Sequence, residues 1–348
     1  MKLASIIEHY ETPFKTKYAD RLLPGQLRAI EAMKRCRTPD AGEVLWHCDD
    51  CAQQLRHPRS CGHRSCPQCQ NHAATQWLAR QQAKLLPVEY FMVTFTLPHE
   101  LRGLAWRAQK RVYNLLLVTA AGTLKDFGLD AKRLRSELGM TTVLHTHSRR
   151  LDYHPHCHVI VPGGGVDRAR RQWRKLKGTY LFNAFALAKV FRARLLAAMK
   201  AEGLSVPDAP QKWVVHCKHI GKGRAALEYL SRYLYRGVIG ESNIVADQDG
   251  QVTFRYTEGG TGSPRYRTLP GEDFLWLVLQ HVLPKGFRRV RDHGFLHGNA
   301  KRLLVLVRWV LRAMIVAAAP KPRPAFKCPR CRSPMHVLAI FSPASQSG

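Results

Sequence analysis

Acidic residues are scarce in this sequence. The 348 residues include 55 Lys and Arg but only 25 Asp and Glu, which gives a formal net charge of +30 with neutral histidines. Nucleic acid is the expected partner of such a cationic chain because Lys and Arg displace counterions from phosphates. An acidic membrane surface is the second candidate, and a basic protein without a polyanion partner is the third. Hydrophobic residues make up 45% of the chain, which excludes a disordered basic protein of the protamine kind.

Long uninterrupted hydrophobic runs are also missing. Arg308 and Arg312 interrupt the most apolar window, residues 303–319, which therefore indicates a buried or amphipathic helix rather than a membrane span. The first ten residues contain Glu8 and His9 and lack the apolar stretch of a signal peptide. We expect a folded protein, with one large domain or two to three smaller ones, that works in the reducing cytoplasm in association with the nucleoid.

Cysteine is concentrated in one part of the chain. Six of the ten cysteines lie within residues 36–69, and they include two Cys-x-x-Cys pairs with fourteen residues between them. A tight turn at each pair can direct two thiolates toward one tetrahedral ion, which is typical of a zinc ribbon. The sequence therefore predicts a structural zinc ion coupled to the folding of residues 36–70. Its predicted ligands are Cys48, Cys51, Cys66 and Cys69.

Several cysteines and histidines are left over from this predicted site. Four of them lie in the same region, where they either complete a second metal site or pack in the interior: Cys36, Cys61, His57 and His63. A further pair, Cys328 and Cys331, follows a proline-rich stretch and looks like half of a zinc ribbon. Because two thiolates cannot close a tetrahedral shell, either His336 helps to bind a metal there or the pair has lost its function.

The expected strands are rich in β-branched and aromatic residues, and the expected helices are rich in Ala, Leu and Arg. Strands are predicted at residues 90–97, 141–161 and 214–217. Helices are predicted at residues 101–127, 180–202 and 225–235. Strands and helices in this order favour an α+β fold with an antiparallel sheet.

Two histidines are separated by one hydrophobic residue within residues 151–161. Residues i and i+2 of a strand point to the same face, so His156 and His158 can meet one divalent ion while the residue between them points into the core. His145 and His147 have the same spacing, but the residue between them is not apolar, so their anchoring in the core is weaker. On spacing alone, a pair of structural histidines explains the motif equally well.

The helix predicted at residues 225–235 combines tyrosines with leucines. Tyr229 and Tyr233 are four residues apart and share one face, while leucines occupy the buried side. Arg232 and Arg236 add positive charge beside them. An ordinary helix that packs through its Tyr and Leu side chains is the alternative interpretation.

The histidine pair and the tyrosine helix together indicate covalent cleavage of a DNA strand. A tyrosine hydroxyl is a poor nucleophile near neutral pH because its reference pKa is about 10. A metal ion that polarises the phosphate under attack would make this hydroxyl useful. A metal site beside a tyrosine helix is therefore a way to cut a DNA strand and to keep its end covalently.

The sequence resembles the transposases of rolling-circle insertion sequences of the insertion-sequence ninety-one type. These enzymes belong to the HUH superfamily of single-strand endonucleases, in which two histidines flank a hydrophobic residue. The resemblance covers nearly the whole chain and includes residues 48–69, 91–102, 151–165, 229–236, 252–256, 269–274 and 281–287. It places the HUH pair on His156 and His158 and the nucleophiles of the two-tyrosine branch on Tyr229 and Tyr233.

This resemblance implies a chemistry and a fold. Such enzymes nick one strand at an end of the element, form a 5′-phosphotyrosine and leave a free 3′-hydroxyl, with Mg²⁺ or Mn²⁺ as the metal. The core would be a ferredoxin-like or RNA-recognition-like antiparallel sheet, with the metal strand at its centre and the tyrosine helix packed across it. The matching motifs do not identify a third metal ligand.

The resemblance also implies an order of domains. The expected units are a zinc-binding domain at residues 1–80, an HUH nuclease domain at 88–245, a C-terminal extension at 246–319 and a Cys-x-x-Cys tail at 320–348. The chain departs from the family's pattern at His147, where a Trp is common, and at residues 61–66. These departures leave the details of zinc ligation and of the loop before the metal strand open.

Single-stranded element ends are the expected DNA partner, and assembly into a homo-oligomer is left open. The candidate phosphate contacts are Arg168, Arg170, Arg171, Arg174, Lys175, Lys177, Arg232 and Arg236. A solvated helix face is the alternative interpretation of the run at residues 168–177. The competing functions are a DNA-binding zinc protein without catalysis, an inactive transposase, and a replication initiator or relaxase with the same chemistry.

Overall fold

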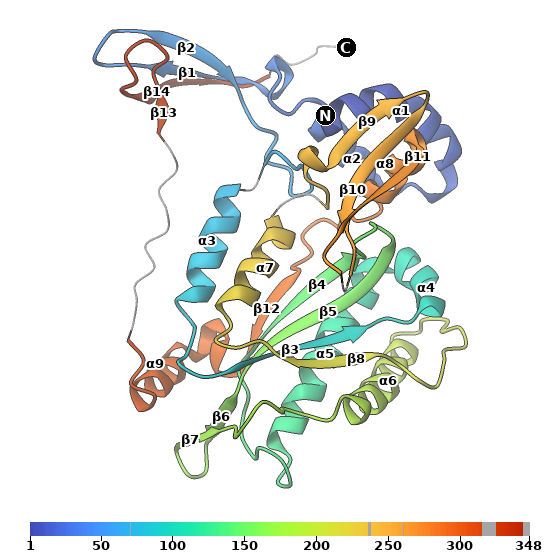
Figure 1. Ribbon diagram of the computed structural model, residues 1–348, viewed down its shortest axis with the longest axis vertical. Helices are drawn as coiled ribbons and strands as arrows, with labels where there is room; N and C mark the ends of the chain where they lie inside the picture. The colour runs from blue at the N-terminus through green and yellow to red at the C-terminus, as the bar shows by residue number, and fades with distance from the viewer. Residues whose placement is uncertain (70, 236–237, 260, 315–324, 344–348) are drawn as a thin grey trace.

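The computed structural model describes residues 1–69, 71–235, 238–259, 261–314 and 325–343, without the side chains of residues 71 and 232–235 (Figure 1). The helices are α1 (Leu3–Lys17), α2 (Pro24–Lys34), α3 (Asn71–Gln82), α4 (Arg102–Arg107), α5 (Gln109–Leu129), α6 (Ala184–Ala201), α7 (Arg224–Tyr235), α8 (Gly271–Leu279) and α9 (Lys301–Val310). The strands are β1 (Glu43–His47), β2 (Gln54–Pro58), β3 (Tyr90–Thr96), β4 (Met140–His147), β5 (Tyr153–Pro162), β6 (Gly164–Asp167), β7 (Gln172–Lys175), β8 (Val215–His219), β9 (Ile244–Gln248), β10 (Gln251–Thr257), β11 (Pro264–Pro270), β12 (Val290–His293), β13 (Phe326–Lys327) and β14 (Pro334–Phe341). None of the helices described here is long and apolar enough to cross a lipid bilayer.

A five-stranded antiparallel sheet forms the centre of the molecule. Its strand order is β12-β4-β5-β3-β8, so β5 lies in the middle. The strands predicted at residues 90–97 and 214–217 are confirmed as β3 and β8, whereas the extended stretch predicted at residues 141–161 is divided by a turn into β4 and β5. The predicted α+β class, with an antiparallel sheet and a central histidine strand, is therefore confirmed.

One face of this sheet is apolar and is covered by α5 and α6. Phe91, Val93 and Phe95 occupy alternate positions of β3, and they belong to the same hydrophobic cluster as Phe191 of α6. Cys157 of β5, which pairs with Phe95, continues this face across the sheet. The alternation along each strand thus sends the intervening side chains to the opposite face.

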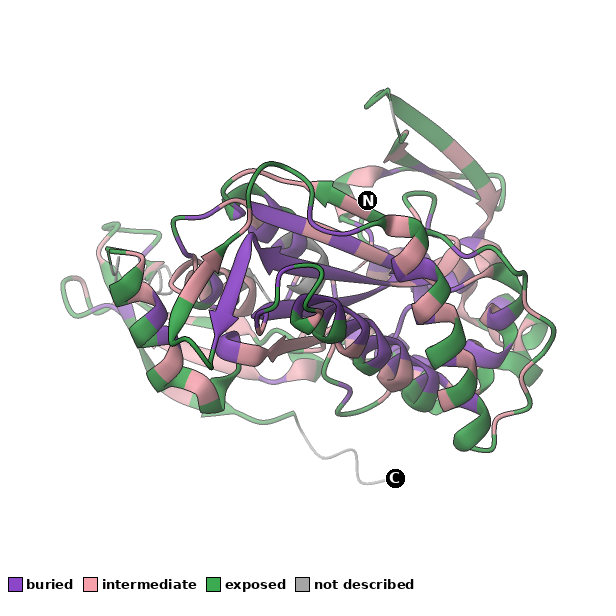
Figure 2. Ribbon diagram, turned by 90° about the horizontal axis from the view of Figure 1, so that it is seen from below, coloured by how far each residue is buried: buried purple, intermediate pink, exposed green. Residues whose placement is uncertain are grey.

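The opposite face carries the histidines and is covered by α3, α7 and α9. His156 and His158 alternate with the core residues of β5 and point to this face. Val143 of β4 pairs directly with His158 and belongs to one hydrophobic cluster with Leu227 and Leu230 of α7. The helix predicted at residues 225–235 is thereby confirmed and lies across the histidine face (Figure 1), while Figure 2 shows the sheet strands as largely buried.

The other two predicted helices are present with shifted boundaries. The helix expected at residues 101–127 is divided into α4 and α5 at Ala108, whose backbone is not helical. The helix expected at residues 180–202 begins only at Ala184 because the side chain of Asn183 accepts a hydrogen bond from the backbone N–H of Ala186 and caps α6.

The N-terminal helices pack against a second, three-stranded sheet. α1 and α2 share a hydrophobic cluster with α8 and with the sheet of order β11-β10-β9. Tyr10 of α1 donates a hydrogen bond of 2.6 Å to the Asp247 carboxylate of β9. The expected domains at residues 1–80 and 246–319 therefore contribute to one hydrophobic cluster rather than to two.

The remaining sheet combines segments from both sides of the core. β1 and β2 form one hairpin, β13 and β14 form another, and β14 pairs with β1 in antiparallel orientation. The resulting four-stranded sheet stands apart from the central sheet at the top of Figure 1. Residues 43–58 and 326–341 thus form one unit, although they belong to different expected domains, at residues 1–80 and 320–348.

Candidate functional site

Three histidine side chains converge on the histidine face of the central sheet. His145 of β4 pairs directly with His156 of β5, and His158 follows two residues later on the same strand. The ring centroids are 5.2 Å apart for His145 and His156, 4.4 Å for His145 and His158, and 4.8 Å for His156 and His158. One nitrogen from each ring lies within 4.8 Å of the others. The three side chains can therefore share one divalent ion.

His145 is the member of this group that its sequence pattern does not favour, because the residue between His145 and His147 is not apolar. Its position follows from the hairpin that joins β4 to β5. The backbone N–H of Ser148 donates to the Asp152 carbonyl at 2.9 Å, and Leu151 takes a left-handed φ of 67° in the turn. A regular hairpin closed by this bond would pair residue 145 with residue 155, but the register shifts between His145 and His147, and this irregularity brings His145 opposite His156.

Hydrogen bonds orient the two histidines of β5. The Nδ1–H of His156 donates to the His154 carbonyl at 2.7 Å, which leaves the lone pair of its Nε2 for a metal. The Nδ1 of His158 lies 2.9 Å from the Thr94 hydroxyl on the neighbouring strand. Such outer partners fix ring orientation around bound metals.

Burial keeps the three imidazoles neutral near pH 7. It lowers the pKa of His158 to about 4. Burial, together with the neighbouring histidines, also holds the pKa of His145 and His156 well below the ordinary value of 6.5. A neutral imidazole is the form that binds a metal. The donor set thus fits a divalent cation.

Tyr229 of α7 opens onto a pocket of about 500 Å³ beside the histidines. His147 also lines this pocket, and its ring stacks on that of His145 at 6.4 Å. Arg149 and Arg255 bring positive charge to the same pocket. Tyr229, His147 and two arginines therefore line one space.

The second predicted tyrosine cannot be placed in the same way. Tyr233 lies on α7, but its side chain is outside the part of the chain that the structure describes, as is the side chain of Arg232. Arg236 lies entirely outside the described residues. The spacing of Tyr229 and Tyr233 along one helix remains the argument for their common face.

The basic run at residues 168–177 forms the turn between β6 and β7 and the strand β7, not a helix. Arg170 and Arg174 bind the Asp167 carboxylate, and Arg168 binds Glu137. The backbone N–H of Arg170 and the Arg174 guanidinium lower the pKa of Asp167. These three cations are therefore paired within the protein, while three other members of the run are exposed to solvent: Arg171, Lys175 and Lys177.

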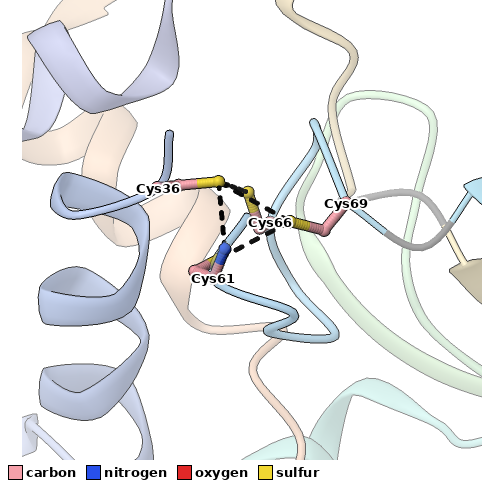
Figure 3. A group of neighbouring side chains, drawn as sticks. All are labelled: Cys36, Cys61, Cys66 and Cys69. Carbon is pink, nitrogen blue, oxygen red and sulfur yellow. Dashed lines mark hydrogen bonds between the residues drawn. The ribbon is translucent and has the colours of Figure 1, made fainter. Parts of the chain in front are cut away.

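The cysteines fall into two groups of four that differ from the predicted set. One group contains Cys36, Cys61, Cys66 and Cys69 (Figure 3). The other group contains Cys48, Cys51, Cys328 and Cys331. The prediction of one site formed by Cys48, Cys51, Cys66 and Cys69 is therefore wrong. Its two Cys-x-x-Cys pairs lie in different units. Cys48 and Cys51 follow β1 in the four-stranded sheet, whereas Cys66 and Cys69 pack near the end of α2.

The first group, shown in Figure 3, has the spacing of a tetrahedral zinc site. The Sγ atoms of Cys36 and Cys69, of Cys61 and Cys69, and of Cys36 and Cys66 are each 3.6 Å apart. Zn–S bonds of about 2.3 Å in a tetrahedron place sulfur atoms about 3.8 Å apart, whereas a disulfide needs about 2.0 Å. Cys36 and Cys61, for which the sequence alone does not decide between metal binding and packing, thus complete this group.

Two family descriptions match the chain. One, "Putative transposase", matches residues 139–303, which contain the histidine group and α7. The other, "Transposase zinc-binding domain", matches residues 6–97, which contain the first cysteine group. The match to a zinc-binding domain supports the zinc ion that the cysteines predict.

Two relatives match over most of their length. A "Putative transposase y4qJ" of Sinorhizobium fredii is 32% identical over 345 residues, which cover 92% of this chain and 86% of the relative. The "Transposase for insertion sequence element IS801" of Pseudomonas savastanoi pv. phaseolicola is 31% identical over 307 residues, which cover 80% and 73%. Among solved structures, the conjugative relaxase TrwC in complex with mutant OriT DNA matches 62% of this chain and 72% of its own, with 16% identity and a TM-score of 0.29.

Proposed function

The chain belongs to the IS91 family of rolling-circle transposases, and on this premise we propose that it cuts and rejoins single DNA strands through a covalent phosphotyrosine. The observation that carries the proposal is the convergence of His145, His156 and His158 on the face of the sheet that α7 covers. A structural pair of histidines would not require a third imidazole in the same group. Tyr229 lies on the helix that covers this face and opens onto the adjoining pocket.

The three histidines would hold Mg²⁺ or Mn²⁺, and imidazole ligands favour the softer Mn²⁺. When bound, the ion would withdraw charge from the scissile phosphate and stabilise the charge that develops there. The hydrogen bonds of His156 and His158 to the His154 carbonyl and to Thr94 would keep both rings in place. Because all three imidazoles are neutral, no proton has to leave before they bind a cation.

Tyr229 would attack the phosphate as the nucleophile. Its Oη loses a proton and forms the new bond to phosphorus, the bond from phosphorus to the 3′-oxygen breaks, and that oxygen takes up a proton and leaves as a 3′-hydroxyl. The number of phosphodiester bonds is unchanged, so a second strand can displace the tyrosine without external energy. Tyr233, four residues further along α7, is the proposed second nucleophile, and two nucleophiles allow two transfers in succession.

DNA is the proposed partner, and single-stranded element ends are the proposed substrate. Arg149 and Arg255 lie in the pocket of Tyr229 and can contact phosphates on either side of the cut. Arg171, Lys175, Arg232 and Arg236 remain proposed contacts further along the strand. The formal charge of +30 supports a polyanionic partner of this kind.

The test uses single-stranded oligonucleotides that tile the DNA flanking the gene and carry a label at the 3′ end. With Mn²⁺ or Mg²⁺ we expect a labelled fragment attached to the protein. His145→Ala should abolish both this product and Mn²⁺ binding, while DNA binding persists because the basic surface is unchanged. His216→Ala, an exposed histidine of β8 outside the three-histidine group, is the matched control.

Two outcomes would contradict the proposal. DNA binding without cleavage in the wild-type protein would favour the competing interpretations, a DNA-binding zinc protein without catalysis or an inactive transposase. Full cleavage by His145→Ala would show that the three-histidine group does not hold the catalytic metal.

A further inference from the structure

The second cysteine group is assembled from two parts of the chain that lie far apart in sequence. The Sγ atoms of Cys48 and Cys331 are 3.4 Å apart and those of Cys51 and Cys328 are 3.6 Å apart, at sequence separations of 283 and 277 residues. We propose that these four thiolates bind a second structural zinc ion, which joins residues 43–58 to residues 326–341. This site extends beyond residues 6–97, the range that matches a zinc-binding domain.

The two Cys-x-x-Cys turns have the same backbone structure. The N–H of Cys48 donates to the Gln53 carbonyl at 3.0 Å, and the N–H of Cys328 donates to the Ser333 carbonyl at 2.8 Å. Each bond spans five residues and closes the loop that holds both cysteines. In each loop the residue after the second cysteine is left-handed, with φ of 53° at Ala52 and 66° at Arg332. Two equivalent turns that each present two thiolates are the halves of a zinc ribbon.

Strand pairing brings the two turns together. Each turn connects the strands of a hairpin, β1 with β2 and β13 with β14. β1 and β14 pair from Glu43 with Phe341 to His47 with His336. Cys48 directly follows β1 and Cys331 precedes β14, so the last pair of this register places the two turns side by side.

The apolar support around the site is small. Cys48, Cys328 and Met335 are its buried hydrophobic residues among those described, and Trp46 stacks on Phe326 at 5.0 Å beside them. So few buried side chains rarely stabilise a four-stranded sheet without a metal or a disulfide. Sulfur separations of 3.4 and 3.6 Å exceed the S–S bond of a disulfide, about 2.0 Å, and fit four thiolates around one ion.

A nearby histidine does not belong to the ligand set. His336, which the sequence offers as a helper for Cys328 and Cys331, faces the Asp49 carboxylate at 3.1 Å. It is not among the four ligands that lie within 4.8 Å of one another. Four cysteines complete a tetrahedral shell and leave no open position for a catalytic water, so the ion is structural.

The experiment measures the zinc that a mercurial reagent releases from the purified full-length protein, because the mercurial displaces metal from thiolates and not from histidines. We expect two zinc ions per wild-type chain and one in the variant with Cys328→Ser and Cys331→Ser. Cys217→Ser, which changes a cysteine outside both groups, should keep two. In the double variant, hydrogen exchange should become faster in residues 43–58, while residues 90–96 and 153–162 keep their protection.

Three results would overturn the proposal. Two zinc ions in the double variant would mean that Cys328 and Cys331 are not ligands. One zinc ion in the wild-type protein, or a disulfide between Cys48 and Cys331 found by mass spectrometry, would mean that the second group does not hold zinc. Unchanged exchange in residues 43–58 after loss of one zinc ion would show that the metal does not support the ribbon.

Discussion

At the scale of single residues, burial determines the chemistry of the histidines. An imidazole in water carries a proton for part of the time near pH 6.5, but His145, His156 and His158 are held neutral by their desolvation. Burial also lowers the pKa of His147, at the edge of the group, to about 4. The site therefore presents lone pairs rather than charges, as a cation requires.

His281 supplies a prediction on the pH dependence of stability. This buried residue lies against His147, its Nε2–H donates to the Leu151 carbonyl at 2.8 Å, and burial holds its pKa well below 6.5. The unfolded chain takes up a proton as the pH falls below 6.5 and the folded chain does not, so acid destabilises the folded state by up to about 1.4 kcal/mol per pH unit. His281→Gln keeps a donor and removes the titration. We expect its free energy of unfolding to fall less than that of the wild type between pH 6.5 and 5.5. Parallel curves would contradict this assignment.

His145 also shows what local sequence patterns cannot predict about the site. His156 and His158 are evident from their spacing on one strand, since alternation is a property of neighbouring residues. His145 joins them only through the register of β4 against β5. A shift of that register by one residue would turn its ring to the apolar face. The proposed third ligand thus depends on a turn and on the register shift between His145 and His147, which the histidine spacing does not specify.

At the scale of elements, contacts with the two strands β3 and β4 position the helix α7 on the sheet. Its start is set by Gly223, which has a φ of 79°, and a Cβ there would lie 2.7 Å from the Tyr90 ring of β3. Leu227 and Leu230 then pack on Val143 of β4. The helix therefore contacts two strands of the sheet, and these contacts set where Tyr229 lies.

Gly223→Ala tests this positioning, with Gly221→Ala as its control. Both glycines have a left-handed φ, so both substitutions introduce backbone strain of about 1–3 kcal/mol. Only the Cβ at position 223 meets another atom within 4 Å. We expect Gly223→Ala to be destabilised further than Gly221→Ala, by about 1–3 kcal/mol in denaturant unfolding. Equal destabilisation would mean that α7 moves away from Tyr90 without cost.

The helices and strands of the core could be predicted from the sequence more completely than the way in which they pair and pack. Alternation gives β3 and β5, and the Tyr/Leu spacing gives α7, because each pattern is local. The basic run at residues 168–177 carries no such pattern, and its strand β7 pairs with β6, where Asp167 binds Arg170 and Arg174. Local composition could not distinguish that hairpin from a solvated helix.

At the scale of the whole molecule, the charge of +30 favours many phosphate contacts, and their number sets how DNA binding depends on salt. The affinity for a single strand should fall linearly on a log–log plot, with a slope of about 0.7 for each phosphate contact. Arg171→Gln with Lys175→Gln removes two exposed cations of the β6–β7 hairpin and should flatten the slope by up to about 1.4. Arg133→Gln, whose charge is already paired with Asp130, should leave the slope unchanged. Binding that does not respond to salt would contradict the electrostatic account.

The pairing of the cysteines is likewise a property of the whole molecule. The sequence indicates Cys-x-x-Cys turns, because each is local, but it does not indicate which two turns share an ion. Cys48 and Cys51 meet Cys328 and Cys331 only after β1 and β14 pair across the chain. The nearest pair in sequence, Cys66 and Cys69, joins Cys36 and Cys61 instead.

The central claim is that a tyrosine of α7 becomes covalently joined to the 5′ end of the cut DNA strand. It is tested most directly by digesting the covalent product with a protease and identifying the modified peptide by mass spectrometry. The account predicts a nucleotide on Tyr229 or Tyr233, and no adduct when both are changed to Phe, since Tyr→Phe removes the attacking oxygen and keeps the ring. Tyr180→Phe, at an exposed tyrosine outside α7, should retain the adduct. An adduct that persists in the double variant, or that maps to Tyr235, would contradict the assignment of the nucleophiles.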